Sequence, residues 1–193
     1  MKDIILMGIQ GSGKGTQAKF LREHFGEKMK YFEMGGILRA LQATDNVLGK
    51  YISYYTKNGL LINPAIPAGL WRVFMETLQE GEWILGDGML RTLEQTIQIV
   101  QQMRERDRSF VVVCLEIPDE EVYKRLTHRA KLDGNNARKD DTDAQAIKNR
   151  IEAFHRETEP ALEWLEGQGV LVRVNGMQTE EEIFGEILRI VEK

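Results

Sequence analysis

Short apolar runs alternate along the chain with longer stretches in which apolar residues recur every three or four positions. The apolar runs have the length of strands and lie at residues 4–7, 30–32, 83–85, 110–117 and 170–174. Such alternation is the sequence form of a parallel sheet whose strands are joined by helical crossovers. The pattern therefore predicts an α/β fold, in which helices wrap a five-stranded parallel sheet.

Helix signals fall between these runs and after the last of them. The predicted helices cover residues 16–25, 119–130, 142–165 and 179–191. Thr142 and Thr179 each stand three residues before a Gln or Glu, which is the capping-box pattern of a helix start. Pro160 lies inside the third stretch, where we expect the helix to bend.

Two stretches interrupt the alternation of strands and helices. Residues 41–70 hold helix-length patterns but no strand, and Gly59, Pro64 and Pro67 are expected to mark turns there. Residues 131–140 are polar and rich in turn formers, which is typical of a mobile surface loop. We therefore expect a single domain with one small helical insertion and one short loop.

Composition narrows the partners of the protein. The 193 residues carry a formal net charge of −4, which gives no general attraction to nucleic acid or to anionic lipid. The single cysteine, Cys114, lies in an apolar run and excludes a disulfide within the chain and a cysteine zinc site. The apolar residues 4–7 are too few for a membrane span. We expect a cytoplasmic protein that binds neither nucleic acid nor a membrane.

One glycine-rich segment carries candidate chemistry, and its sequence is Gly8-Ile9-Gln10-Gly11-Ser12-Gly13-Lys14-Gly15-Thr16. It meets the phosphate-loop pattern G-x-x-x-x-G-K-[ST], except that Gly15 takes the hydroxyl position and Thr16 follows one residue later. A strand precedes the segment and a helix follows it, so backbone N–H groups can surround a phosphate while Lys14 supplies positive charge. The alternative is an ordinary glycine-rich turn with an exposed lysine, which the spacing and the flanking elements disfavour.

The same segment, with glycine between lysine and threonine, resembles the loop of the adenylate kinase family. Further segments resemble that family in order along essentially the whole chain. They are 32–39, 59–62, the signature Asp87-Gly88-Met89-Leu90-Arg91-Thr92 with Gln95, the helix bearing Arg125 and Arg129, and 138–141 with Arg150. Taken singly, each arginine is more simply explained as a solvated surface charge, and only their agreement with separate motifs favours a site.

The resemblance implies a nucleoside monophosphate kinase of the short-lid type, without zinc. It implies reversible, magnesium-dependent transfer of the ATP γ-phosphoryl group to AMP, which gives two ADP. The core would comprise residues 1–33, 71–130 and 141–193, with an acceptor-binding insertion at about 34–70 and a lid at about 131–140. We expect the protein to work as a monomer, with ATP and AMP or ADP as its partners.

The resemblance also implies roles for individual residues. Donor ATP would be bound by Gly11, Ser12, Gly13, Lys14, Gly15, Thr16, Arg125 and Arg129. Acceptor AMP would be bound by Met34, Gly35, Arg39, Ile62, Gly88, Arg91, Gln95, Arg138 and Arg150. The catalytic set would be Lys14, Arg91, Arg129, Arg138 and Arg150, because a phosphoryl group in flight needs positioning and positive charge. Magnesium would be held by Thr16 and Asp87, through water.

The chain departs from the family pattern mainly on the acceptor side. The family usually has Ser-Thr-Gly-Asp where this chain has Glu33-Met34-Gly35-Gly36, so the hydroxyl that contacts the AMP adenine is missing at Met34. Met89-Leu90 replaces Phe-Pro, which removes a ring and a fixed backbone dihedral ahead of Arg91. The spacing from Asp141 to Arg150 is one residue longer than usual, so Lys148 or Asn149 could take part of the place assigned to Arg150.

These departures keep two other functions open. A pyrimidine or broad-specificity nucleoside monophosphate kinase would share the donor loop and differ in the base it accepts. A nucleotide-binding regulatory module would keep the loop but catalyse weakly. Gln95 retains an amide that can read an adenine edge, which favours AMP over UMP or CMP.

Overall fold

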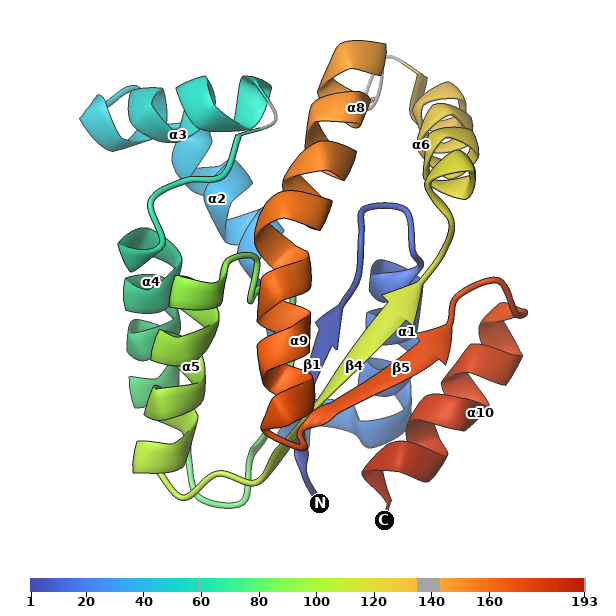
Figure 1. Cartoon of the computed structure of the whole chain (residues 1–193). Coiled ribbons are helices and arrows are strands. Elements are labelled where there is room, and N and C mark those ends of the chain that lie inside the picture. The colour runs from blue at the N-terminus through green and yellow to red at the C-terminus, as the bar shows by residue number, and fades with distance from the viewer. Residues whose placement is uncertain (59, 135–142, 193) are drawn as a thin grey trace.

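Five parallel strands form one sheet at the centre of the computed structural model, which describes residues 1–58, 60–134 and 143–192. In spatial order the strands are β2 (Met29–Glu33), β3 (Trp83–Asp87), β1 (Asp3–Met7), β4 (Phe110–Glu116) and β5 (Leu171–Asn175). All four pairings between neighbours are parallel, and β1, β4 and β5 can be followed in Figure 1. This confirms the predicted fold class, and the register places the carboxyl ends of β1, β2 and β3 side by side.

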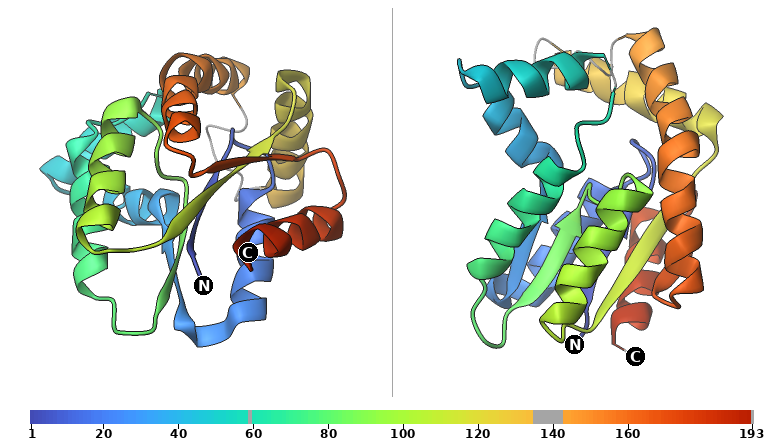
Figure 2. Two further views of the ribbon diagram at one scale, coloured as in Figure 1. Left: turned by 60° about the horizontal axis from the view of Figure 1, so that its bottom comes forward. Right: turned by 60° about the vertical axis from the view of Figure 1, so that its left-hand side comes forward.

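Helices cover both faces of the sheet (Figure 2). Those that pack around it are α1 (Lys14–Phe25), α4 (Ala65–Glu76), α5 (Leu93–Glu105), α9 (Glu159–Gly167) and α10 (Glu180–Val191), while α2 (Met34–Gln42), α3 (Val47–Lys57), α6 (Asp119–Asp133) and α8 (Ala144–Ala153) reach beyond the strand ends. In the ranges that the structure describes, no helix is both long and apolar enough to cross a membrane.

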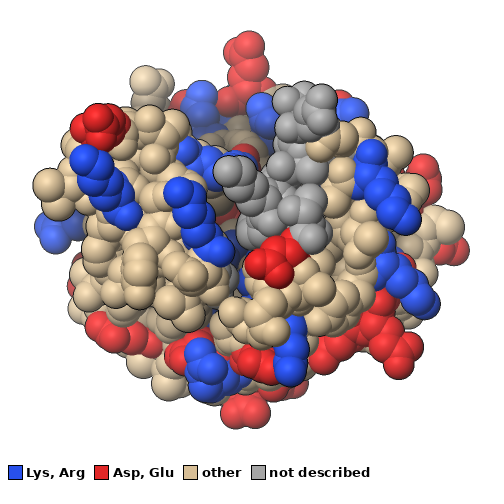
Figure 3. Space-filling model, turned by 90° about the horizontal axis from the view of Figure 1, so that it is seen from above, with Lys and Arg blue, Asp and Glu red and all other residues tan. Residues whose placement is uncertain are grey.

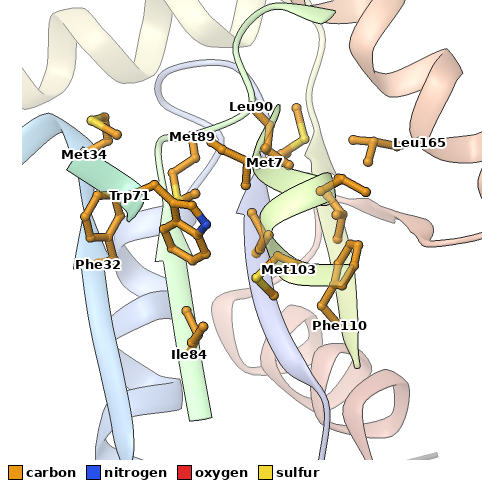
Figure 4. Close-up of a cluster of buried hydrophobic side chains, with 14 of the residues drawn as sticks. Met7, Phe32, Met34, Trp71, Ile84, Met89, Leu90, Met103, Phe110 and Leu165 are labelled. Atoms are coloured by element: carbon orange, nitrogen blue, oxygen red, sulfur yellow. The ribbon is translucent and has the colours of Figure 1, made fainter. Parts of the chain in front are cut away.

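The alternation of side chains along β1 divides the core into two layers. Ile5 and Met7 face a cluster built with α4, α5 and α9, whereas Ile4 and Leu6 face one built with α1 and α10. Trp71 lies fully buried in the first cluster (Figure 4). Because a parallel strand is covered on both faces, every residue of β1 is buried and its sequence is uniformly apolar after Asp3.

One of the two predicted capping boxes is confirmed, and the other lies partly outside the described residues. Thr179 and Glu182 form the predicted capping box at the start of α10. Thr142 lies outside the described residues, and Asp143 caps α8 through the backbone N–H of Gln145. Predicted lid residues 135–140 also lie outside the described residues.

Two of the prolines that were expected to mark a turn or a bend act differently in the structure. Pro67 does not mark a turn but lies in the first turn of α4, where a missing N–H breaks no helical hydrogen bond. Pro160 lies in the first turn of α9 and follows a π-helical segment, η3 (Phe154–Thr158), which joins α8 to α9. The change in helix geometry therefore precedes the proline, and such π-helical segments are frequent at functional sites.

Candidate active site

The glycine-rich loop follows β1 and leads directly into α1. Its glycines adopt backbone angles that other residues rarely accept, with φ of 133° at Gly8, 83° at Gly11 and 98° at Gly13. A Cβ at Gly8 would lie 2.4 Å from the carbonyl oxygen of Leu115, so a larger residue is excluded there. Gly15 differs, because it lies within α1 and a Cβ there would meet no other atom within 4 Å.

The first turn of α1 presents its backbone to the site. Gly13 caps the helix in a left-handed conformation, and Gln17 makes the first helical bond by donating to the Gly13 carbonyl. The N–H groups of Lys14, Gly15 and Thr16 therefore precede the helical hydrogen-bond ladder. The first turn contains no acidic residue, so nothing there opposes an anion at this positive helix end.

Lys14 is folded back over the loop that carries it. Its Nζ donates to the carbonyl oxygens of Gly8 at 2.8 Å and Ile9 at 2.9 Å. Burial, together with the charges of Arg91 and Arg150, lowers the pKa of Lys14 to about 8, while the charge of Asp87 acts in the opposite direction. The ammonium thus lies within electrostatic reach of three other predicted site residues, and an incoming phosphate would restore the pairing that burial removes.

Asp87 ends β3 and lies beside the loop. Its side chain is buried and accepts a hydrogen bond from the Tyr31 hydroxyl at 3.2 Å. Burial raises the pKa of this carboxyl, and Lys14 lowers it by less. The nearby cations therefore do not fully offset the cost of burying the charged Asp87 carboxylate. A hard divalent cation, which prefers oxygen ligands, would stabilise the charged form.

The main chain of Arg91 is held from both sides by buried side chains. Its N–H donates to Gln95 Oε1 at 2.8 Å, and its carbonyl accepts from the Thr158 hydroxyl at 2.8 Å. The guanidinium Nε donates to the Gly88 carbonyl at 3.1 Å. Because Gln95 uses its oxygen on Arg91, the NH₂ end of this amide is the group that can donate to a base.

The turn before Arg91 is built differently from a Phe-Pro turn. Leu90 has φ of 57°, whereas proline is restricted to about −65°. The Leu90 side chain is fully buried in the core, next to Met89, which offsets the strain of its backbone (Figure 4). A proline at position 90 therefore does not fit the backbone of this turn.

Arg125 and Arg129 lie one helical turn apart on α6, beside the loop. Arg125 donates from Nη2 to the Gly176 carbonyl at 3.0 Å and from Nε to Glu121 at 2.9 Å. Its Cβ lies 3.5 Å from the position of a Cβ at Gly11, so it adjoins the glycine loop directly. Arg150 comes from α8 and acts on Lys14, as described above, whereas Arg138 lies outside the described residues.

The predicted acceptor residues lie on α2 and around it. Gly35 and Arg91 both border Gly88, because a Cβ at Gly88 would lie 3.6 Å from Arg91 Nη2 and 3.8 Å from the Gly35 nitrogen. Arg39 is on the same helix and is exposed, and Ile62 is partly exposed in the segment between α3 and α4. Met34 is 2 % exposed and packs in the core, so its thioether is largely withdrawn from the surface.

Basic side chains border part of a hollow on the face of the molecule that is seen from above (Figure 3). Three residues to which sequence reasoning assigned no role contact predicted site residues. Tyr31 donates to Asp87, Glu33 accepts from Arg39, and Thr158 donates to the Arg91 carbonyl. No motif marks Thr158, because its partner lies 67 residues away. Glu33 did have a signal, since it replaces an uncharged residue of the family pattern. The arrangement combines an anion-binding loop, a buried carboxylate and converging cations.

Comparisons with known proteins agree with this arrangement. The family model described as adenylate kinase matches residues 6–170. The adenylate kinase of Thermus thermophilus is 34% identical over 187 residues, which cover 95% of this chain and 94% of that protein. The adenylate kinase of Leptospira biflexa is 33% identical over 192 residues, covering 99% and 100%, and that of Phocaeicola vulgatus is 30% identical over 194 residues, covering both chains fully. The chain therefore belongs to the adenylate kinase family of phosphotransferases.

Proposed function

We propose that this protein transfers the γ-phosphoryl group of ATP to AMP, reversibly and with magnesium, to give two ADP. The observation that carries this proposal is the convergence on Lys14 of charges from separate segments, namely Asp87, Arg91 and Arg150. Phosphoryl transfer needs little covalent help from a protein and depends on positioning and on electrostatic stabilisation of the transferred group.

The donor side of the proposed site is the glycine loop with α6. Backbone N–H groups from Gly11 to Thr16 and the ammonium of Lys14 would bind the β- and γ-phosphates of ATP. Arg125 would stack on the adenine, since its planar cation lies beside Gly11 and Gly176 at the edge of the loop. Arg129, on the same helix, would contact the donor phosphates.

The acceptor side consists of α2 and the turn after β3. Arg39 and Arg91 would hold the AMP phosphate, with the backbone of Gly35 and Gly88 beside it. Gln95 would donate from its amide nitrogen to an acceptor on the adenine edge. Met34 and Ile62 would contribute apolar contact to the base, although the burial of Met34 leaves little of its side chain to do so.

Magnesium fits the residues that are present. Asp87 offers a buried carboxylate whose pKa is raised by burial, and Thr16 offers a hydroxyl in the first turn of α1. We propose that these two residues hold the ion through water. Bound there, Mg²⁺ would neutralise phosphate charge and orient the donor phosphates.

The transferred group must also be protected from water, which competes as an acceptor. We propose that residues 34–70 and 131–140 act as an acceptor lobe and a lid that close over the core, bringing Arg138 and Arg150 to the phosphates. A monomeric state and a cytoplasmic location are part of the same proposal.

Acceptor choice tests this function. ADP formation from Mg–ATP should be measured with AMP, CMP, UMP and GMP in parallel, and AMP is expected to give the highest kcat/KM. Rejection of AMP with use of CMP or UMP would identify a pyrimidine nucleotide kinase instead. Binding of ATP without phosphorylation of any monophosphate would identify a regulatory module.

A further inference from the structure

A carboxylate on the acceptor side lies where the family pattern does not have one. Glu33 takes the place of the usual serine, while Gly36 takes the place of the usual aspartate, so the negative charge has moved by three residues. Glu33 ends β2, and its Cα pairs with that of Asp87 at the end of β3. The displaced carboxylate therefore lies at the same edge of the sheet as the candidate active site.

The Glu33 carboxylate binds the arginine that is proposed to hold the acceptor phosphate. Arg39 Nη2, in the last turn of α2, donates to Oε1 of Glu33, the residue that precedes the helix, at 2.6 Å. A Cβ at Gly36 would lie 2.9 Å from Glu33 Oε2, and a Cβ at Gly35 would lie 2.9 Å from Arg39 Nη1. The pair thus occupies space that two consecutive glycines leave open.

This geometry sets a competition for one guanidinium. A phosphate binds Arg best when two N–H groups point at two oxygens, and a carboxylate uses the same fork. Glu33 must release Arg39, or share it at the expense of like-charge repulsion, when a phosphate dianion arrives. The carboxylate is also close enough to Asp87 to raise the pKa of that residue, so its field reaches the site.

We propose that Glu33 is an affinity-determining residue of the acceptor site, which competes with the monophosphate for Arg39 and thereby weakens acceptor binding without affecting the donor. This inference rests on the proposed function, because it assumes that Arg39 binds the acceptor phosphate. The side chains of Arg39 and Glu33 are 46% and 36% exposed, and exposed ion pairs are worth about 0–1 kcal/mol. The expected effect is therefore modest, up to about fivefold in affinity.

Two variants should break the ion pair between Glu33 and Arg39 by different means. Glu33→Gln removes the charge of the competitor. Gly36→Ala keeps every charge, but its Cβ meets the flexible end of Glu33 and displaces it from Arg39. The added methyl group should not obstruct the acceptor, because the family carries a larger aspartate at this position. Alanine also suits α2 better than glycine, so both variants should fold.

The test is calorimetric titration of the full chain with AMP and, separately, with Mg–ATP. We expect both variants to bind AMP about two- to fivefold more tightly than the wild type, with ATP affinity unchanged. Unchanged or weaker AMP binding in either variant would overturn the inference, as would an equal gain for ATP. Failure of the wild type to bind AMP would contradict the proposed function itself, and with it this inference.

A double-mutant cycle separates the ion pair from a general charge effect. In an Arg39→Gln background, Glu33→Gln should leave AMP affinity unchanged, because the guanidinium for which Glu33 competes has been removed. A gain as large as in the wild-type background would show that Glu33 acts only through its overall negative field, and would overturn the competition.

Discussion

The Thr158 hydroxyl donates to the carbonyl oxygen of Arg91 at 2.8 Å, although the two residues are 67 positions apart. Thr158 is 6% exposed and ends the π-helical segment η3, which continues from α8 into α9. This hydrogen bond connects the helical segment that carries Arg150 to the main chain of Arg91. The last residue of the π-helical segment is therefore the one whose hydroxyl faces Arg91.

Removing this hydroxyl should displace Arg91. Thr158→Val keeps the shape of the side chain and leaves the Arg91 carbonyl without its donor, so we expect about a tenfold loss in kcat with a loss of about 1–3 kcal/mol in unfolding free energy. Thr158→Ser retains the hydroxyl and should restore kcat. Steady-state kinetics of both variants check this, and equal kcat values in the valine variant and the wild type would contradict a positioning role.

The pKa of Lys14 predicts an alkaline limit to activity. Burial lowers this pKa to about 8 in the free protein, so the fraction of charged ammonium falls as the pH rises above 8. We expect kcat/KM to decline above about pH 8, and kcat to decline only at higher pH, because bound phosphate stabilises the ammonium. In Lys14→Arg the alkaline decline of whatever activity remains should disappear. A wild-type kcat/KM that is constant to pH 9.5 would contradict this assignment.

Proline, which the family pattern has at the position of Leu90, should destabilise the turn in this chain. Leu90→Pro forces φ from 57° toward about −65° and must rebuild the turn that leads into Arg91. Leu90→Ala keeps the backbone and loses only buried contacts, which costs about 2–5 kcal/mol. We expect the proline variant to be less stable than the alanine variant in urea denaturation. A proline variant as stable as the wild type would show that the turn is not constrained at this position.

A buried ion pair far from the site provides a stability test without catalytic consequences. Asp3 is 2% exposed, and its Oδ1 accepts from Arg108 Nη2 at 2.7 Å and from the Ile84 N–H at 2.9 Å. Arg108→Met would leave the buried carboxylate without its cation, which should lower the unfolding free energy by about 3–5 kcal/mol. Activity per folded molecule should remain unchanged at low temperature. A stability equal to that of the wild type would contradict the pair's importance.

The strands and the loop were predictable because their signals are local. The apolar run of β1, the glycines and Lys14 occur within a dozen residues, and each element obeys a short-range rule of periodicity or backbone conformation. The contact of Thr158 with Arg91 has no such signal, since it depends on where a π-helical segment places a hydroxyl. Pro67 was misread for a related reason, because the start of α4 could not be located closely enough to place it in the first turn.

The acceptor side shows the same limit in another form. The sequence revealed that Glu33 and Gly36 depart from the family pattern, but not that the two changes are linked. Only the side-chain geometry shows that the glycine makes room for the carboxylate, and that the carboxylate reaches Arg39. The link between the two departures, at positions 33 and 36, is therefore visible only in the distances between Glu33, Gly36 and Arg39.

Phosphoryl transfer between two nucleotides, at the site that contains Lys14 and Arg91, is the central activity that we propose for this protein. The direct test is to follow ADP formation from ATP, AMP and Mg²⁺ with the wild type, Lys14→Ala and Arg91→Ala, with circular dichroism of each. We predict two ADP for every ATP consumed by the wild type, a loss of more than about a hundredfold in both variants, and unchanged folding. Wild-type protein that binds ATP without forming ADP, or variants that lose activity only because they unfold, would contradict it.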